Sequence, residues 1–187
     1  MSQELANEIS KEFTEITNIK CTATYMEKGS THTPTTLDSD KKGVYVFLID
    51  EKTCFKVGKA NSKSQARWNS HHYSVDKSTP STFTKSILKN LHILKKYFNQ
   101  EDIKKFESIL NKYYINQSEF KDSIKNLDKK KVKDLSNELN LKIWIKNNIS
   151  RIEFLLENTD DNIDFDSNLL EALIQFRLKP IFEGKNA

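Results

Sequence analysis

Two neighbouring stretches of β-branched and aromatic residues constrain this fold more than any other feature of the chain. Residues 43–50 read Gly-Val-Tyr-Val-Phe-Leu-Ile-Asp, and residues 53–58 read Thr-Cys-Phe-Lys-Val-Gly. Neither stretch has a helical period, and both are rich in residues that favour strands. Because the residues between them are polar and suit a turn, we predict a β-hairpin, although this turn contains no glycine.

Apolar residues elsewhere recur mostly at helical spacing. The predicted helices cover residues 3–18, 61–73, 79–94, 103–113 and 135–148, and a last helix runs from Ser167 to the proline at position 180. Residues 150–156 alternate as a third strand would. This order of a helix, a hairpin, several helices, a strand and a helix predicts an α+β fold with a small mixed β-sheet flanked by helices.

Composition excludes several classes of protein. Of 187 residues, 36% are hydrophobic and 30% are charged, with only 4 Gly, 3 Pro and 2 Cys. Collagen-like, low-complexity and disulfide-scaffold chains are therefore excluded, and one globular domain with a substantial core is expected. We expect no transmembrane helix, no secretory signal and hence no membrane partner. Cys21 and Cys54 form no metal or disulfide pattern, Cys54 is predicted to be a small core residue, and a cytoplasmic compartment fits best.

The positive charge of the chain is concentrated in one segment. The 30 basic residues are 27 Lys and 3 Arg, and the net charge is +4. Residues 1–40 carry a balance of −4, residues 41–105 a balance of +9, and residues 106–187 a balance of −1. Such a segment is typical of a surface that binds phosphates, and a merely solvated lysine surface is an equally good interpretation of charge alone.

Several side chains suited to phosphate chemistry occur in and beyond the predicted hairpin. They are Tyr45, Lys56, Lys59, Arg67, His71 and Glu171. Arg67 and His71 are spaced i, i+4, which places them on one helical face, and Glu171 is an acid in an otherwise apolar part of the last helix. Cations bind phosphate and stabilise added negative charge, a carboxylate can hold Mg²⁺, and a Tyr or His can accept a proton from water.

These residues also have ordinary structural interpretations. Tyr45 could be a core aromatic, and Lys56 and Lys59 could be two of many solvated lysines. The histidines at positions 32, 71, 72 and 92 lack metal-ligand spacing, so no zinc site is predicted. The sequence has neither a Gly-rich phosphate loop nor a serine nucleophile elbow. From the chemistry of these residues alone, a nuclease is one of several functions that the chain could have.

The order and spacing of these residues resemble those of the GIY-YIG nuclease family over roughly residues 41–182. The motifs that carry the resemblance are Gly43-Val44-Tyr45, Lys56-Val57-Gly58-Lys59-Ala60, Arg67 with His71, and Glu171 followed by Pro180. Ser81-Thr82-Phe83 and Trp144 further resemble a restriction-like or uncharacterised bacterial branch of that family.

The resemblance implies a small three-stranded mixed sheet flanked by helices, and cleavage of DNA that depends on a single divalent cation. It implies that Tyr45 is the base or orients the attacking water, that Arg67 contacts the scissile phosphate, and that Glu171 binds Mg²⁺ or Mn²⁺. Lys59 matches a lysine that is common after the second motif, and His71 occupies a position that holds His or Tyr in the family.

Two positions depart from the family pattern. Lys56 stands where the family has tyrosine, and Glu183 stands where it has asparagine. A lysine can still polarise water or neutralise phosphate, whereas Glu183 adds negative charge near a phosphate. We expect a metal-dependent DNA endonuclease, with a catalytically inactive DNA-binding module as the alternative. A third hypothesis, a structural protein, predicts that Tyr45, Arg67 and Glu171 do not come together.

The predicted domain organisation is an N-terminal helix and loop extension over residues 1–40, followed by a nuclease domain over residues 41–187 with a helical insertion at about 95–148. The extension and the insertion are the candidates for DNA specificity. Lysines between residues 121 and 133 either contact DNA phosphates or are solvated. A restriction or defence enzyme is the expected subtype, and cutting both strands of a duplex would call for a homodimer.

Overall fold

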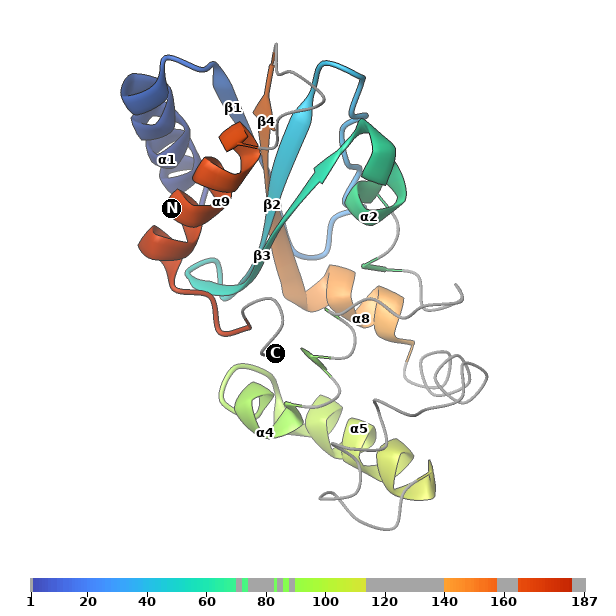
Figure 1. Ribbon diagram of the computed structural model, residues 1–187. Coiled ribbons are helices and arrows are strands. Elements are labelled where there is room, and N and C mark those ends of the chain that lie inside the picture. The colour runs from blue at the N-terminus through green and yellow to red at the C-terminus, as the bar shows by residue number, and fades with distance from the viewer. Residues whose placement is uncertain are drawn as a thin grey trace. The chain divides into compact units, whose positions relative to one another are not determined.

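The computed structural model describes residues 2–69, 72–73, 83, 86–87, 90–113, 140–157 and 165–182. The chain divides into two compact units, which are described separately. One unit comprises residues Met1–Ser70 and Ile149–Ala187, and the other comprises residues His71–Asn148. The first unit holds the β-sheet and the second is helical in its described part (Figure 1).

The described strands form one antiparallel sheet with the order β1-β4-β2-β3. Their bounds are β1 Cys21–Met26, β2 Lys42–Ile49, β3 Thr53–Asn61 and β4 Ile149–Leu156. The prediction of an α+β fold is confirmed. The finer prediction of a three-stranded mixed sheet is wrong, because β1 adds a fourth strand and each pair of neighbouring strands runs antiparallel.

The predicted hairpin is β2 and β3, and its turn forms without glycine. Asp50 and Glu51 both take positive φ, at 52° and 59°. The Lys52 N–H donates to the Ile49 carbonyl at 3.2 Å. Two positive φ values at the central residues of the turn from Ile49 to Lys52 match the right-handed twist of a hairpin. An Asp and a Glu thus adopt here a conformation that glycine or asparagine usually supplies.

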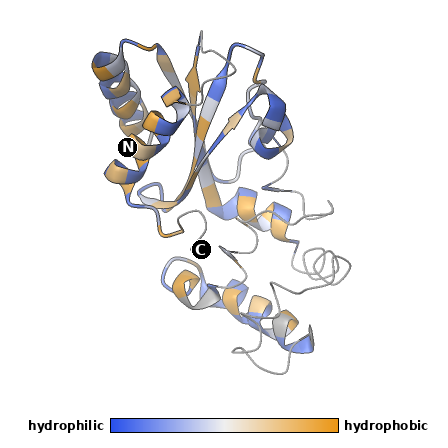
Figure 2. Ribbon diagram, viewed as in Figure 1, coloured by the Kyte–Doolittle hydropathy of each residue, from blue (hydrophilic) through white to orange (hydrophobic). Residues whose placement is uncertain are grey.

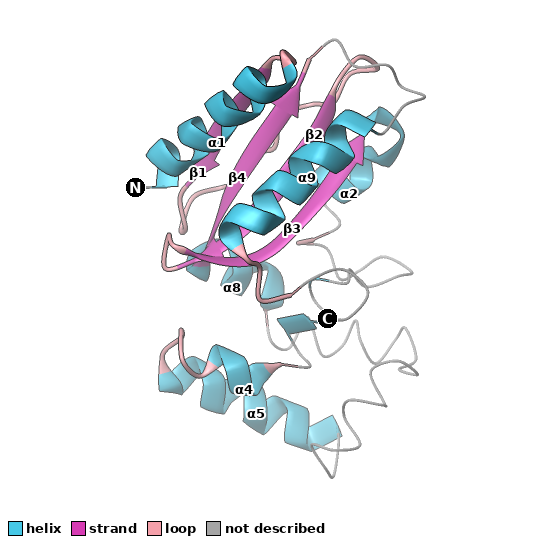
Figure 3. Ribbon diagram, turned by 60° about the vertical axis from the view of Figure 1, so that its left-hand side comes forward, coloured by secondary structure: helices cyan, strands magenta, loops and turns pink. Residues whose placement is uncertain are grey.

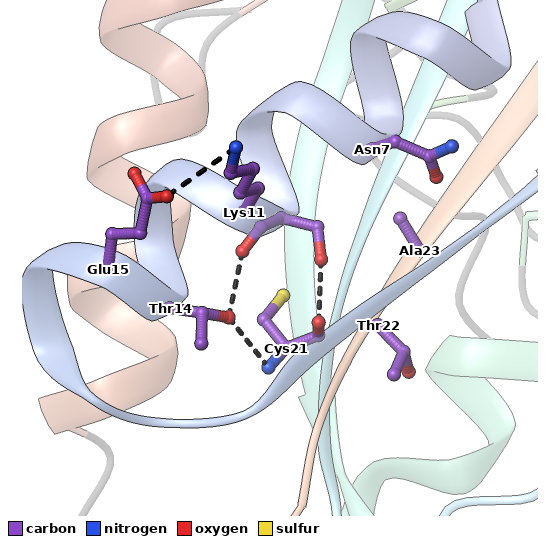
Figure 4. A pocket seen from close by; sticks show the side chains of 8 residues that line it. Asn7, Lys11, Thr14, Glu15, Cys21, Thr22 and Ala23 are labelled. Carbon is purple, nitrogen blue, oxygen red and sulfur yellow. Dashed lines mark hydrogen bonds and ion pairs between the residues drawn. The ribbon is translucent and has the colours of Figure 1, made fainter.

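Strand β1 was not predicted, and it lies at one edge of the sheet beside helix α1, Ser2–Thr17. Side chains of α1 bond to the backbone of this edge. The Ser10 hydroxyl donates to the Cys21 carbonyl at 2.6 Å, and the Cys21 N–H donates to Thr14 Oγ1 at 3.2 Å (Figure 4). Such bonds protect an edge strand from pairing with another chain.

Helices α1 and α9, Phe165–Leu178, cover one face of the sheet (Figure 3). Figure 2 shows apolar and polar residues alternating along α1, as its predicted helical pattern requires. The buried core beneath them consists of Ala6, Ile9, Phe13, Cys21, Val44, Val46, Leu48, Cys54, Val57, Ile152, Phe154, Leu156, Leu170 and Ile174. Cys54 is thus the small core residue that was predicted.

The opposite face of the sheet is covered in part by α2, Gln65–Asn69, which a 3₁₀ turn, Ser62–Ser64, precedes. Trp68 of α2 is fully buried and lies over Gly43. A Cβ on Gly43 would lie 2.5 Å from Cη2 of Trp68, so glycine is required for the helix to approach this closely.

The helical unit contains α4, Leu91–Leu94, α5, Gln100–Tyr113, and α8, Leu141–Asn148. Phe98 and Phe106 pack against Trp144, with ring centroids 4.6 and 5.0 Å from the indole. Asn99 caps α5, since its Oδ1 accepts the N–H groups of Glu101 and Asp102 at 2.8 and 2.9 Å. The predicted helix over 103–113 is confirmed, and residues 121–133 lie outside the described residues.

In the described ranges, no helix is both long enough and apolar enough to span a bilayer.

Candidate active site

Tyr45 of β2 is placed by a glycine on the neighbouring strand. Its register partner is Gly58 of β3, and the phenol ring lies over this residue. A Cβ on Gly58 would lie 2.5 Å from Cζ of Tyr45, so only glycine leaves space for the ring. Trp68 meets the ring edge-on, with centroids 6.1 Å apart. Tyr45 is consequently fully buried, as its ordinary structural interpretation also required.

Lys56 is a buried cation on the same face of the sheet. It stands opposite Phe47 in β2, and its other side pairs with Phe182 after α9. Only 3% of Lys56 is exposed. The pKa of its amine is lowered from the ordinary 10.5 to about 8, because burial and, to a smaller extent, the positive charge of Arg67 outweigh the opposite effect of Glu171.

Arg67 of α2 is the exposed member of this group. Burial raises the pKa of the Tyr45 phenol, whereas the charge of Arg67 and a hydrogen bond from Arg67 lower it. The same arginine also shifts the pKa values of Lys56 and Glu171. Arg67 therefore lies within electrostatic reach of all three side chains.

Glu171 and Lys59 approach from the other face of the sheet. Lys59 donates through Nζ to Oδ1 of Asn168, which lies one turn before Glu171 on α9. Glu171 is half-buried, and burial raises the pKa of its carboxyl, while Lys59, Arg67 and Lys56 lower it. The carboxylate is therefore surrounded by cations.

The candidate site is thus wrapped around β3, an edge strand of the described sheet. Helix α9 contacts β3 from one face and α2 contacts it from the other (Figures 1 and 3). Of the residues predicted from the sequence, the structure brings together Tyr45, Lys56, Lys59, Arg67 and Glu171. His71 and Glu183 lie outside the described residues.

Glu171 is the residue of this group that could hold a divalent cation. Among the described residues no three His, Cys, Asp or Glu side chains gather as a metal cluster. Mg²⁺ commonly binds through one or two carboxylates and substrate phosphates, while it keeps several waters. A single half-buried carboxylate fits that mode. Because three cations surround Glu171, a bound phosphate would be needed to make the site favourable for Mg²⁺.

Sequence reasoning missed the polar residues that lie behind the site. Arg151 and Glu153 of β4 are fully buried and form an ion pair of 2.8 Å. The Thr35 N–H donates to Glu153, Arg151 donates to the Trp68 carbonyl, and the Trp68 indole N–H donates to the Thr35 carbonyl. One signal was present, because two opposite charges two residues apart in an otherwise apolar strand must point to the same face.

Comparison of the chain with known protein families, with curated proteins and with solved structures finds no match. The function has therefore to be inferred from these residues and their arrangement.

Proposed function

We propose that this protein is a divalent-metal-dependent endonuclease that hydrolyses phosphodiester bonds in DNA. The observation that carries the proposal is the gathering of Tyr45, Lys56, Lys59, Arg67 and Glu171 from β2, β3, α2 and α9 around one edge strand. Titratable groups with mutually perturbed pKa values are typical of active sites. A purely structural role predicted that the tyrosine, the arginine and the glutamate would lie apart.

The substrate phosphate would meet Arg67 and Lys59 first. Arg67 is exposed and Lys59 is half-buried, whereas Tyr45 and Lys56 lie deeper. A guanidinium presents several donors in a fork that matches phosphate oxygens. Both cations would stabilise the negative charge that develops at phosphorus when water attacks.

Activation of the attacking water would divide between the tyrosine, which orients it, and the buried lysine, which takes its proton. The raised pKa of Tyr45 keeps its phenol protonated near neutral pH, so the phenol orients water and does not take its proton. Lys56, with a pKa of about 8, is partly neutral in mildly alkaline solution and can accept that proton. Lys56 would thereby act as the base, a role that the resemblance implies for Tyr45.

Glu171 would hold Mg²⁺ or Mn²⁺ together with oxygens of the bound phosphate. The cation, when bound, would neutralise charge on the phosphate and on the leaving oxygen. The sequence resemblance to GIY-YIG nucleases, which rests on the same residues, supports this assignment.

DNA is the expected partner, and the charge distribution supports it. Residues 71–148 carry 16 basic and 9 acidic side chains, so the helical unit holds a positive excess while the whole chain has a net charge of only +4. Lysines of that unit would bind backbone phosphates without reading sequence. A restriction or defence enzyme that acts as a homodimer and works in the cytoplasm is the finer form of the proposal.

Incubation of the protein with supercoiled plasmid and phage DNA, in Mg²⁺ or Mn²⁺, tests the proposal. We expect nicked or linear product, and Glu171→Gln should lower the rate at least about 100-fold. Glu15→Gln on α1 is the matched control, because Glu15 is exposed and pairs with Lys11 at 3.7 Å away from the site. A fully active Glu171→Gln variant would remove Glu171 from the metal site.

The alternative is a DNA-binding module without catalysis, and the lysine at position 56 motivates it. It predicts DNA binding that weakens steeply with salt, and no cleavage in either metal. Single-turnover cleavage of any DNA substrate excludes this alternative.

A further inference from the structure

We propose that Arg151 and Glu153 are positioning residues of this site. Together with Trp68 and the backbone of the exposed Thr35 they form a closed ring of polar contacts, called here the polar ring, which fixes α2 and the Tyr45 phenol. The inference rests on the proposed function, since it assigns these residues a role in placing the groups that would bind and cleave DNA.

The polar ring closes through four contacts. Arg151 Nη2 lies 2.8 Å from Glu153 Oε1 and donates to the Trp68 carbonyl, also at 2.8 Å. The Trp68 Nε1–H donates to the Thr35 carbonyl at 2.6 Å. The Thr35 N–H donates to Glu153 Oε2 at 3.1 Å, which completes the circuit. The ring therefore ties α2 and the loop before β2 to the central strand β4.

Helix α2 needs such an attachment. It spans five residues, and a helix of this length does not hold its shape without tertiary contacts. Trp68 is anchored at both ends, by its indole N–H and by its backbone carbonyl. Arg67 directly precedes Trp68, so the ring sets where the Arg67 backbone lies and where its guanidinium can reach.

Arg151 also contacts the ring of Tyr45. The Arg151 guanidinium is 5.6 Å from the Tyr45 ring centroid and 5.1 Å from that of Trp68. In the sheet register Glu153 stands opposite Tyr45, and Arg151 stands opposite Phe47. The guanidinium is therefore held between β4 and the two aromatic rings, and it fixes their relative positions by cation–π contact.

Packing alone does not account for this pair. Arg151 and Glu153 are both 0% exposed, and well-packed apolar residues of similar volume often stabilise a fold as well as a buried ion pair does. Apolar residues cannot accept the Thr35 N–H or donate to the Trp68 carbonyl. The pair thus determines where α2 lies. The proposed nuclease requires this, because α2 carries Arg67.

The experiment replaces both charges together, since loss of one would leave the other buried and unpaired. In Arg151→Met combined with Glu153→Met, we expect a folded protein whose single-turnover plasmid cleavage in Mg²⁺ is about 100-fold slower, because misplacement of a catalytic group by about 1 Å has such an effect. Affinity for plasmid at low salt should stay close to wild type, because lysines elsewhere supply it. The loss should therefore be in the cleavage rate and not in binding.

A second readout does not depend on activity. Hydrogen exchange of the Trp68 indole N–H, assigned by NMR with Trp144→Phe, should become at least about tenfold faster in the double variant. Ile152→Ala is the control, because Ile152 lies in the same strand and in the core under α1 and α9. Ile152→Ala should destabilise the protein. When the two variants are compared at equal free energy of unfolding, it should not change the exchange rate of the Trp68 indole N–H.

Either of two results would overturn the inference: a double variant that retains wild-type exchange and cleavage, or one whose cleavage loss equals that of Ile152→Ala at the same thermal stability. If the wild type itself cuts no DNA, the proposed function fails. Faster Trp68 exchange in the double variant would then still show that the ring holds α2, and unchanged exchange would overturn that as well.

Discussion

The two faces of the sheet are built from alternate residues of the same strands, yet they perform different tasks. Under α1 and α9, β2 and β4 contribute apolar side chains such as Val46 and Phe154. On the face toward α2, the same strands contribute Tyr45, Arg151 and Glu153, which are equally buried. The first face tolerates any apolar set of the right volume. The second does not, because Arg151 and Glu153 make hydrogen bonds to Trp68 and Thr35 that apolar side chains cannot make. Stability and placement of the site are therefore separable by mutation.

The largest change in stability is expected on the apolar face. Phe154→Ala should lower the free energy of unfolding by about 3–5 kcal/mol, because Phe154 is fully buried and its removal leaves a cavity. Urea unfolding measures the change. The cleavage rate per folded molecule should remain that of the wild type. A lower rate in fully folded variant protein would show that the two faces are not separable.

The next effect depends on pH and lies on the other face. The pKa of Lys56 is about 8 in the folded protein and near 10.5 when unfolded, so the unfolded chain binds more protons between these values. Stability should therefore rise with pH over this window, by about 3 kcal/mol in total. Below pH 8 the buried charge is a constant cost. Lys56→Met should remove both the slope and that cost.

The measurement is urea unfolding of wild type and Lys56→Met from pH 7 to 10.5, with Lys52→Met in the exposed turn as control. The two proteins must be compared at each pH, because burial raises the pKa of Cys21 from 9.0 to about 11, which lowers stability with pH in both. Parallel curves for wild type and Lys56→Met would contradict the buried position of this amine.

The smallest effect concerns the contact between two strands on the site face. Gly58→Ala should cost about 1–3 kcal/mol, because its Cβ would overlap the Tyr45 ring. The same substitution should cost far less in a Tyr45→Gly background and an intermediate amount in Tyr45→Phe, since the phenol oxygen and the ring carbons both make the contact. Thermal unfolding of the four combinations of Gly58→Ala with Tyr45→Gly gives the coupling energy. Coupling near zero would place the ring elsewhere.

Local sequence pattern predicted those elements whose pattern is strong. The hairpin, β4, α1, α5 and α9 were all expected, since apolar spacing and turn residues define them. Strand β1 escaped because only Cys21 of its six residues is buried, which leaves little alternation to detect. The antiparallel direction of β4 relative to β2 could not be predicted either. It depends on where the long connection between these strands returns to the sheet, and not on residues 149–156 themselves.

Those residues of the candidate site that have reactive or charged side chains of their own could be predicted from the sequence. Residues whose role depends on contacts with distant parts of the chain could not. Tyr45, Arg67 and Glu171 stand out by type and by position. Gly58 was noted only as part of a motif, and the structure shows that it accommodates a ring from the neighbouring strand. Arg151 looked like one of three arginines, because Trp68, whose carbonyl accepts its hydrogen bond, is distant in sequence.

The place of β4 in the sheet also dictates when the candidate site can assemble during synthesis. β4 lies between β1 and β2, although it follows both by a long stretch of chain. Until residue 156 has left the ribosome, β1 has no strand to pair with, and until α9 follows, no Glu171 is present. Such distant pairing forms slowly and late. A nascent chain therefore carries the hairpin before it carries the candidate site, which assembles only after α9 has been made.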